Sequence, residues 1–111
     1  MHVVIRADGG SEIGYGHLIR SNALAEEILH RDHEVTVATT TPRPAESVFP
    51  DSCEIVDLPS RGDPQPFIER FASIRPDAVF TDAYPIDTEY QQAVQREVPL
   101  AVLQDDARHA I

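Results

Sequence analysis

The sequence predicts an α/β fold: one domain, residues 1–111, built on a doubly wound parallel sheet of five strands in the order 3-2-1-4-5. Short apolar runs alternate along the chain with segments in which apolar residues recur at helical spacing. Clusters of Gly, Pro and Asp separate these segments and mark the turns. Neither an internal repeat nor a linker divides the chain. Because strands joined through helices pair in parallel with right-handed crossovers, we expect helices on both faces of the sheet.

The first strand and the first helix are expected over residues 2–7 and 17–30. The strand is an apolar run that ends at the turn residues 8–10. The helix is indicated by apolar residues at helical spacing, which are Leu18, Ala23, Leu24, Ile28 and Leu29. We expect this helix to pack one face on the sheet.

The middle of the chain is predicted to hold two strands with a short helical segment between them. Val and Thr dominate residues 34–40, which is the composition of a strand. Pro42 and Pro44 end this strand, and one or two helical turns are expected over 45–49. Residues 53–58 form the third predicted strand.

The last part of the chain repeats the alternation of helix and strand. Asp63 and Pro64 fit the N-cap and the first position of a helix that extends to Ile74. The remaining predicted elements are a strand over 78–81, a helix over 88–97 capped by Asp87, and a strand over 98–103.

The chain has a formal net charge of −10, because nine basic residues, all of them arginine, stand against 19 Asp and Glu. A lysine-free chain with such an excess of carboxylates resembles proteins adapted to very high salt, which screens the repulsion between surface charges. We therefore interpret most of the charges as the hydrated acidic surface of a halophilic protein. The same excess argues against a nucleic-acid partner, since phosphate contacts need clustered Lys and Arg.

Cysteine content and hydropathy bear on disulfides, thiolate metal sites and membrane association. Cys53 is the single cysteine, so the sequence offers neither an internal disulfide nor a pair of thiolate metal ligands. Its place in an apolar strand pattern, residues 53–58, predicts a buried structural thiol. No apolar run approaches the length of a membrane span, and the N-terminus lacks a signal-peptide core. We expect no membrane partner and a cytoplasmic location.

The stretch IGYGHLIR, residues 13–20, is the main candidate for a ligand-binding turn. Gly14 and Gly16 allow a tight turn before a helix that begins near His17, and exposed N–H groups at that helix start favour an anionic ligand. His17 and Arg20, three residues apart, place an acid/base group and a fixed cation on one helix face. The residues alone leave a simpler alternative open, in which the turn needs glycine and His17 is merely polar.

Acidic and polar residues follow three of the predicted strands. In a doubly wound sheet, ligands bind beyond the carboxyl ends of the strands where the strand order reverses, here between the first and fourth strands. The residues that we expect at this rim are Asp8, His17, Arg20, Asp82, Tyr84, Asp105 and Asp106. A carboxylate within reach of His17 would hold its tautomer and raise its basicity, as a general base requires. Each acid taken singly also fits a turn or a helix cap.

Two other kinds of site fit less well. A dinucleotide fingerprint starts directly after its strand, whereas here the glycines come several residues late and Ile19 replaces the third, so NAD is not expected. An acidic Mg²⁺ pocket of the phospho-receiver kind would use Asp8, Asp82 and Asp105. Such receivers also use a lysine, which the chain lacks. We therefore expect neither a cofactor nor a metal at this rim.

Three landmarks resemble one family in their order and spacing. They are Ile5-Arg6-Ala7-Asp8 with Glu12-Ile13-Gly14-Tyr15-Gly16-His17 and Arg20, then Thr81-Asp82-Ala83-Tyr84, then Leu103-Gln104-Asp105-Asp106. The pattern is similar to that of the UDP-sugar hydrolases of the pseudaminic acid pathway and of related spore-coat polysaccharide proteins. The resemblance runs along nearly the whole chain.

This resemblance implies half of a GT-B-type fold, in which two Rossmann-like domains face each other across a cleft. It implies a UDP-linked amino sugar as substrate, hydrolysed with release of UDP and without a metal. By position, His17 would be the general base that activates water, and Gly14, Tyr15 and Gly16 would lie against the diphosphate or the sugar. Lesser contributors to the cleft wall would be Asp8, Arg20, Tyr84 and Asp106, and Asp82 and Asp105 complete the candidate substrate-binding set.

The chain departs from the family at Ala83, where a histidine often stands, and in its length. GT-B proteins grip the nucleotide mostly through a C-terminal domain, so we expect the isolated chain to be inactive. The expected function is the N-terminal half of a UDP-sugar hydrolase or glycosyltransferase-like protein of surface polysaccharide or nonulosonic acid biosynthesis, completed by a separate C-terminal chain or by self-association. Two alternatives stay open: a non-enzymatic half-domain acting as a binding or assembly partner, and an acidic Mg²⁺-binding receiver-like domain.

Overall fold

A computed structural model describes residues 1–11, 14–59, 63–72, 75–82, 92–93, 96 and 102–104. Its elements in chain order are β1 (His2–Ala7), α1 (Gly16–His30), β2 (Glu34–Thr39), α2 (Pro42–Val48), β3 (Glu54–Asp57), α3 (Gln65–Phe71), β4 (Ala78–Asp82) and β5 (Val102–Gln104). Strands and helices alternate through this part of the chain as the periodicity predicts.

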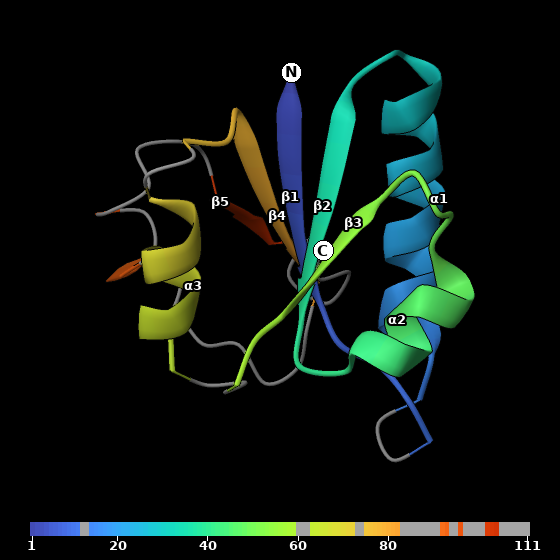
Figure 1. The fold of residues 1–111 in the computed structure, drawn as a ribbon, viewed down its shortest axis with the longest axis horizontal. Helices are drawn as coiled ribbons and strands as arrows, with labels where there is room; N and C mark the ends of the chain where they lie inside the picture. The colour runs from blue at the N-terminus through green and yellow to red at the C-terminus, as the bar shows by residue number, and fades with distance from the viewer. Residues whose placement is uncertain are drawn as a thin grey trace, which may run out of the picture.

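The five strands form one parallel sheet in the order β3-β2-β1-β4-β5, which confirms the predicted order (Figure 1). β1 is central and pairs with β2 on one side and with β4 on the other. Near its carboxyl end, Arg6 lies opposite Ala38 of β2 and Thr81 of β4. The next residue, Ala7, lies opposite Asp82. The connection changes direction between β1 and β4, so this end of β1 is the switch point at which such folds bind ligands.

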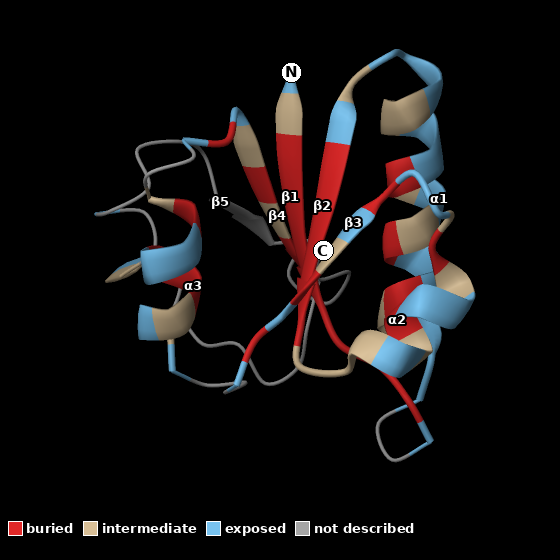
Figure 2. Ribbon diagram, in the orientation of Figure 1, coloured by how far each residue is buried: buried red, intermediate tan, exposed pale blue. Residues whose placement is uncertain are grey.

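Helices cover both faces of the sheet: α1 and α2 lie on one face and α3 on the other (Figure 1). The side chains of β1 alternate between two cores, because successive residues of a strand point to opposite faces. Val3 and Ile5 belong to the core that includes Leu18 of α1, whereas Val4 belongs to the core that includes Phe71 of α3. Figure 2 shows the buried strands between helices whose outer surfaces are exposed.

Cys53 lies directly before β3 and is 6% exposed, within the core on the α1 side. Burial, together with the nearby negative charge of Glu26, raises the pKa of its thiol to about 11. A thiol with that pKa stays protonated at neutral pH and is a poor nucleophile. The prediction of a buried structural thiol is confirmed.

The short helix α2 begins earlier than the sequence pattern indicates. It starts at Pro42 with Thr41 as its N-cap, whereas helical turns were expected only from Ala45. Proline is tolerated in the first turn because the N–H it lacks has no partner inside the helix, and its fixed φ already suits the helix. The prolines after β2 therefore start a helix as well as ending the strand.

The start of α3 is shifted by one residue from the predicted position. Pro64 is the N-cap and the helix begins at Gln65, so Asp63 is not the cap residue itself. Its side chain still ties down the start, because Asp63 Oδ1 accepts the backbone N–H of Gln65 at 3.0 Å. The helix is described as far as Phe71, and the predicted end at Ile74 lies outside the described residues.

Most of the predicted helix over 88–97, with its cap at Asp87, lies outside the described residues. Gln92, Ala93 and Arg96 are described and helical. The last strand, β5, ends at Gln104, one residue beyond the predicted end. Within the described residues, no helix has the length and apolar character that crossing a membrane requires.

Candidate functional site

The connection from β1 to α1 is shaped by glycines, one at a crowded position and two with a backbone conformation that favours glycine. A Cβ on Gly9 would lie 2.5 Å from Cδ1 of Leu18, so the turn after β1 packs directly against α1. Gly10 and Gly14 have φ angles of 146° and 81°, which residues with a Cβ rarely adopt. Their backbones bond each other in both directions, at 3.0 Å and 2.7 Å, and so close the neck of a small loop.

Helix α1 starts directly beyond this loop, at Gly16. Within the described residues, its N-cap residue Tyr15 makes no side-chain capping hydrogen bond, and its first turn contains no acidic residue. The partial positive charge of a 15-residue helix is therefore not offset by a capping side chain. Of the two glycines predicted for the turn, Gly14 lies in it with a positive φ, whereas Gly16 is already the first residue of the helix. The start of this helix has the chemistry that favours an anion.

His17 and Arg20 meet on one face of the first turns of α1, as their spacing predicts. Arg20 Nη2 lies 3.1 Å from His17 Nδ1. A guanidinium can only donate, so Nδ1 accepts, and the neutral ring carries its proton on Nε2. The Arg20 side chain also passes Gly16, where a Cβ would lie 3.9 Å from its Nη1. The ionisable ring of His17 and the permanent cation of Arg20 thus lie together directly after the glycine turn.

Asp8 follows β1 and is buried together with Arg6. Both side chains are 0% exposed, and Arg6 Nη1 donates to Asp8 Oδ1 at 2.7 Å. The same oxygen accepts the hydroxyl of Thr39 at 3.1 Å and the backbone N–H of Thr40 at 2.8 Å. Burial by itself raises the pKa of Asp8, but the hydrogen bonds from Arg6 and Thr40 and the charge of Arg6 outweigh it and hold the pKa below its ordinary value. Asp8 therefore links β1 to the end of β2 as a carboxylate.

The threonines at the end of β2 extend this contact to the glycine turn. Thr41 Oγ1 accepts the backbone N–H of Gly9 at 3.0 Å and lies 3.0 Å from Thr39 Oγ1. The backbone N–H of Thr41 donates to that same hydroxyl of Thr39, at 3.0 Å. Sequence reasoning treated Arg6 as part of a landmark and the threonines as the end of a strand, and so missed this network. The signal was a charged residue inside an apolar strand next to a strand that ends in three hydroxyl residues.

The structure brings part of the predicted rim together. Gly14, Tyr15, Gly16, His17 and Arg20 lie on the turn and the first turns of α1. Asp8 lies at the end of β1, under the turn, where its side chain pairs with Arg6 instead of facing open space. Asp82 ends β4 beside the end of β1. Tyr84, Asp105 and Asp106 lie outside the described residues.

The described residues do not assemble a metal site. Among them, no group of three or more His, Cys, Asp and Glu side chains could hold an ion. Asp8 is the one member of the receiver-like acidic set whose side chain is described, and its Oδ1 faces Arg6 and Thr39. No observation on this part of the chain favours the receiver-like alternative.

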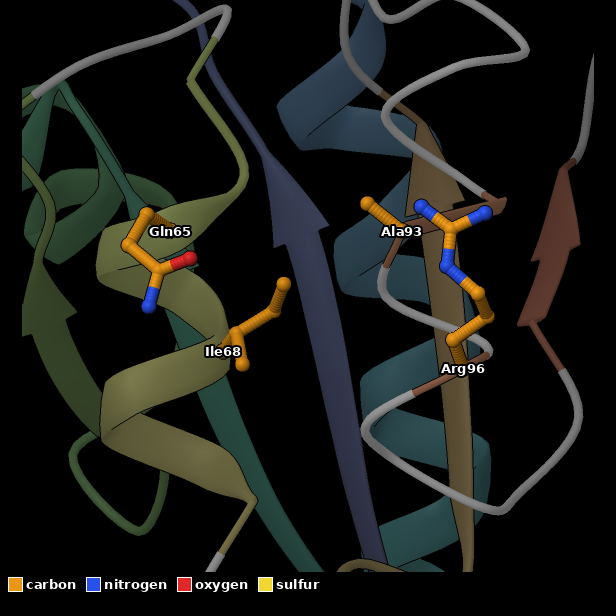
Figure 3. A pocket seen from close by; sticks show the side chains of 4 residues that line it. All are labelled: Gln65, Ile68, Ala93 and Arg96. Carbon is orange, nitrogen blue, oxygen red and sulfur yellow. The ribbon is translucent and has the colours of Figure 1, made fainter.

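A cleft of about 280 Å³ opens on the other side of the sheet (Figure 3). Gln65 and Ile68 of α3 line one side, and Ala93 and Arg96 line the other. The side-chain N–H of Gln65 donates to Glu69 at 3.3 Å, within α3 itself. The cleft adjoins α3, whereas His17 belongs to α1 on the opposite face, so the two are separate features.

Neither a protein-family model nor a curated protein matches the chain. Among solved structures, the fold is similar to a UGT transferase from Siraitia grosvenorii in complex with UDP. The TM-score is 0.64 at 18% sequence identity, over 94% of this chain and 27% of that chain. The described sheet and its helices therefore have the fold of one Rossmann-like half of a GT-B-type glycosyltransferase. This chain spans about a quarter of the length of that transferase, as the 27% coverage gives.

Proposed function

We propose that the chain is the N-terminal half of a UDP-sugar hydrolase or glycosyltransferase-like protein, with His17 activating water at the anomeric centre. The observation that supports this most directly is the position of His17. It lies beside Arg20, in the first turn of a helix without a capping side chain, directly beyond a glycine turn at the switch point of the sheet. That arrangement provides an acid/base group, a cation and backbone N–H groups around one point.

These groups fit the cleavage of a sugar from a diphosphate. Water attacks the anomeric carbon while the bond from that carbon to the diphosphate oxygen breaks, and the electron pair of this bond leaves with UDP. His17 accepts the proton of the attacking water. The N–H groups at the start of α1 and the guanidinium of Arg20 stabilise the charge that grows on the leaving diphosphate.

The resemblance of the sequence landmarks supports a UDP-linked amino sugar and a role in surface polysaccharide or nonulosonic acid biosynthesis. The structural neighbour was solved with UDP bound, which agrees with a nucleotide-sugar ligand. In the proposed protein, a second half, contributed by a longer chain, a partner chain or another copy, holds the nucleotide. The 111-residue chain by itself is then inactive.

The test of His17 measures UDP release from a UDP-linked amino sugar by the complete two-domain protein. We expect His17→Ala to lower kcat by about 100-fold or more, since general base catalysis contributes that much, and to leave KM nearly unchanged. His30→Ala is the matched control, because His30 is an exposed histidine in the last turn of the same helix. Release of UDP at the wild-type rate by His17→Ala would show that His17 is not the base.

A non-enzymatic binding or assembly role is the second candidate, and the exposure of two residues near the turn favours it. Tyr15 is 41% exposed and Ile19, one helical turn later, is 59% exposed. An assembly role predicts that Ile19→Ser weakens self-association or partner binding in sedimentation experiments. It also predicts that the complete protein releases no UDP, so the same hydrolysis assay separates the two candidates.

A further inference from the structure

We propose that Arg20 is a positioning residue that occupies the Nδ1 lone pair of His17 until an anionic ligand draws its guanidinium away. The inference rests on the proposed function, because the anion in question is the diphosphate of the sugar nucleotide. It adds a step that the proposed reaction does not contain: the base becomes available only when the leaving group is in place.

The contact itself determines which nitrogen of His17 carries the proton. Arg20 Nη2 lies 3.1 Å from Nδ1, and all hydrogen-bonding groups of a guanidinium are donors. Nδ1 must therefore be unprotonated, and in the neutral ring the proton is on Nε2. The i, i+3 spacing on α1 puts the two side chains on neighbouring turns of one face, so the contact forms within the helix.

This state of the ring cannot act as a general base. The lone pair of Nδ1 is engaged by Arg20, and Nε2 has no lone pair to offer because it carries the proton. If the proton moved to Nδ1 to free the lone pair of Nε2, two N–H donors, one on Nδ1 and one on the guanidinium, would face each other and could not hydrogen-bond. By either route, His17 accepts a proton from water only after its hydrogen bond with Arg20 breaks.

A diphosphate has the chemistry to break that bond. The contact is exposed and joins a cation to a neutral ring, so water competes with it and the contact is weaker than an ion pair. A phosphate offers the same guanidinium two parallel, charge-assisted hydrogen bonds, which are stronger. The N–H groups at the start of α1 lie one turn away and attract the same anion. The guanidinium of Arg20 therefore binds the anion, and its hydrogen bond to His17 Nδ1 breaks.

The chain offers a matched control on the same helix. Arg31 follows the last turn of α1, where its Nε donates to Glu27 at 2.9 Å. Arg31→Met removes one positive charge, as Arg20→Met does, and leaves the neighbourhood of His17 unchanged. A difference between the two variants therefore reports the contact with His17 and not the loss of one charge.

The experiment is ¹⁵N NMR of the histidine rings in the 111-residue chain, at a pH where they are neutral. In the wild type and in Arg31→Met, we expect the Nδ1 resonance of His17 at the position of a hydrogen-bonded acceptor. In Arg20→Met, it should move to the position of a ring open to water. Inorganic pyrophosphate added to the wild type should move it in the same direction, and pyrophosphate should bind Arg20→Met about tenfold more weakly.

Three results would overturn the proposal, and they differ from one another. An Nδ1 resonance that is the same in the wild type and in Arg20→Met would show that Arg20 does not hold the ring. If pyrophosphate shifts the amide resonances of Gly14 and Gly16 but leaves the Nδ1 resonance of His17 unchanged, the anion binds without releasing His17 from Arg20, and the proposal is wrong. Millimolar pyrophosphate that shifts none of these signals would argue against a diphosphate at this helix. The proposed function is tested separately, by UDP release from the complete protein in which the second half holds the nucleotide, and Arg20→Met still reports the contact in the free chain.

Discussion

At the residue scale, Arg6 and Asp8 form a fully buried ion pair next to the glycine turn. Two full charges are buried away from water as a pair, and Asp8 also accepts hydrogen bonds from Thr39 and Thr40. Removing one partner of such a pair leaves an uncompensated buried charge, which destabilises a protein much more than loss of a surface pair. Asp8, predicted as a ligand contact, therefore has an observed structural role, while its contact with ligand stays a prediction.

Asp8→Asn is expected to lower the free energy of unfolding by about 3–5 kcal/mol, because it removes the carboxylate that pairs with the buried guanidinium of Arg6. Chemical denaturation of the wild type and the variant measures the difference. Glu27→Gln is the control: it breaks the Arg31–Glu27 pair, whose side chains are 69% and 58% exposed. That loss should be about 0.5 kcal/mol or less. Equal losses in the two variants would contradict the role assigned to burial.

The stabilisation from Asp8 is also expected to depend on pH. Its pKa in the folded chain lies below the ordinary 3.8, so the unfolded chain binds the proton more readily. The contribution is therefore complete above pH 3.8 and is lost as the pH falls through the lower, folded-state pKa. The stability difference between the wild type and Asp8→Asn should shrink below that pH. A difference that stays constant between neutral and acidic pH would show that the charge of Asp8 is not responsible.

Gly9→Ala tests the close approach of the turn to α1. The new Cβ would lie 2.5 Å from Leu18 Cδ1, so either the turn or Leu18 must move. We expect a loss of about 1–3 kcal/mol in the free energy of unfolding, as for other overpacked sites. The double variant with Leu18→Ala should lose less than the sum of the two single changes. Gly16→Ala is the control, because a Cβ there meets only Arg20 Nη1, at 3.9 Å.

At the scale of elements, the end of β2 positions the turn after β1. Thr41 accepts the N–H of Gly9 and contacts the hydroxyl of Thr39, so the loop between β1 and α1 is held from the neighbouring strand. Helix α1 then packs on the same turn through Leu18. The start of α1 is thus oriented by contacts on both sides and not by its own sequence alone.

Thr41→Val is expected to loosen that turn, because it removes the acceptor of the Gly9 N–H while keeping the shape of the side chain. Amide hydrogen exchange at Gly9 should become faster, with a stability loss of about 1–2 kcal/mol. Thr41→Ser keeps the hydroxyl and should restore slow exchange. Thr36→Val is the control: its hydroxyl lies 2.7 Å from His2 Nε2, nearer the start of the strands. Unchanged exchange at Gly9 in Thr41→Val would show that the turn does not depend on this bond.

At the scale of the whole molecule, the charge of −10 on 111 residues predicts that stability depends on salt. Like charges repel across the folded surface, and salt screens them over about 10 Å at 0.1 M and about 3 Å at 1 M. We expect the chain to lose structure as salt is removed, and circular dichroism against salt concentration measures this. A signal that stays constant from molar salt to low salt would contradict the interpretation of a halophilic surface.

The elements of the fold were predictable because their signals are local. The apolar period of residues 17–30 led to α1, and the alternation of strands and helices led to the order of the sheet. The boundaries at Pro42 and Pro64 were less predictable. Proline stops one element and permits the next, and which effect applies depends on the backbone around it.

The site was predictable where it lies on continuous chain. Gly14, Gly16, His17 and Arg20 fall on one turn and one helix face, so spacing was enough to bring them together. Asp8 is predicted at the rim, but its side chain hydrogen-bonds Arg6 and the end of the neighbouring strand β2 at Thr39. Which partner it meets follows from strand register, and sequence spacing does not report register between separate strands.

The sequence by itself determined the α/β class, the glycine turn and the pairing of His17 with Arg20, because each follows from the period of a strand or a helix. Only the tertiary structure decided that Asp8 is buried against Arg6 and that Thr41 holds Gly9. It also decided that Leu18 packs so close to Gly9 that a side chain there would force one of them to move. Gly9 and Thr41 are 32 residues apart and meet because β1 and β2 pair in parallel, which places their carboxyl ends together.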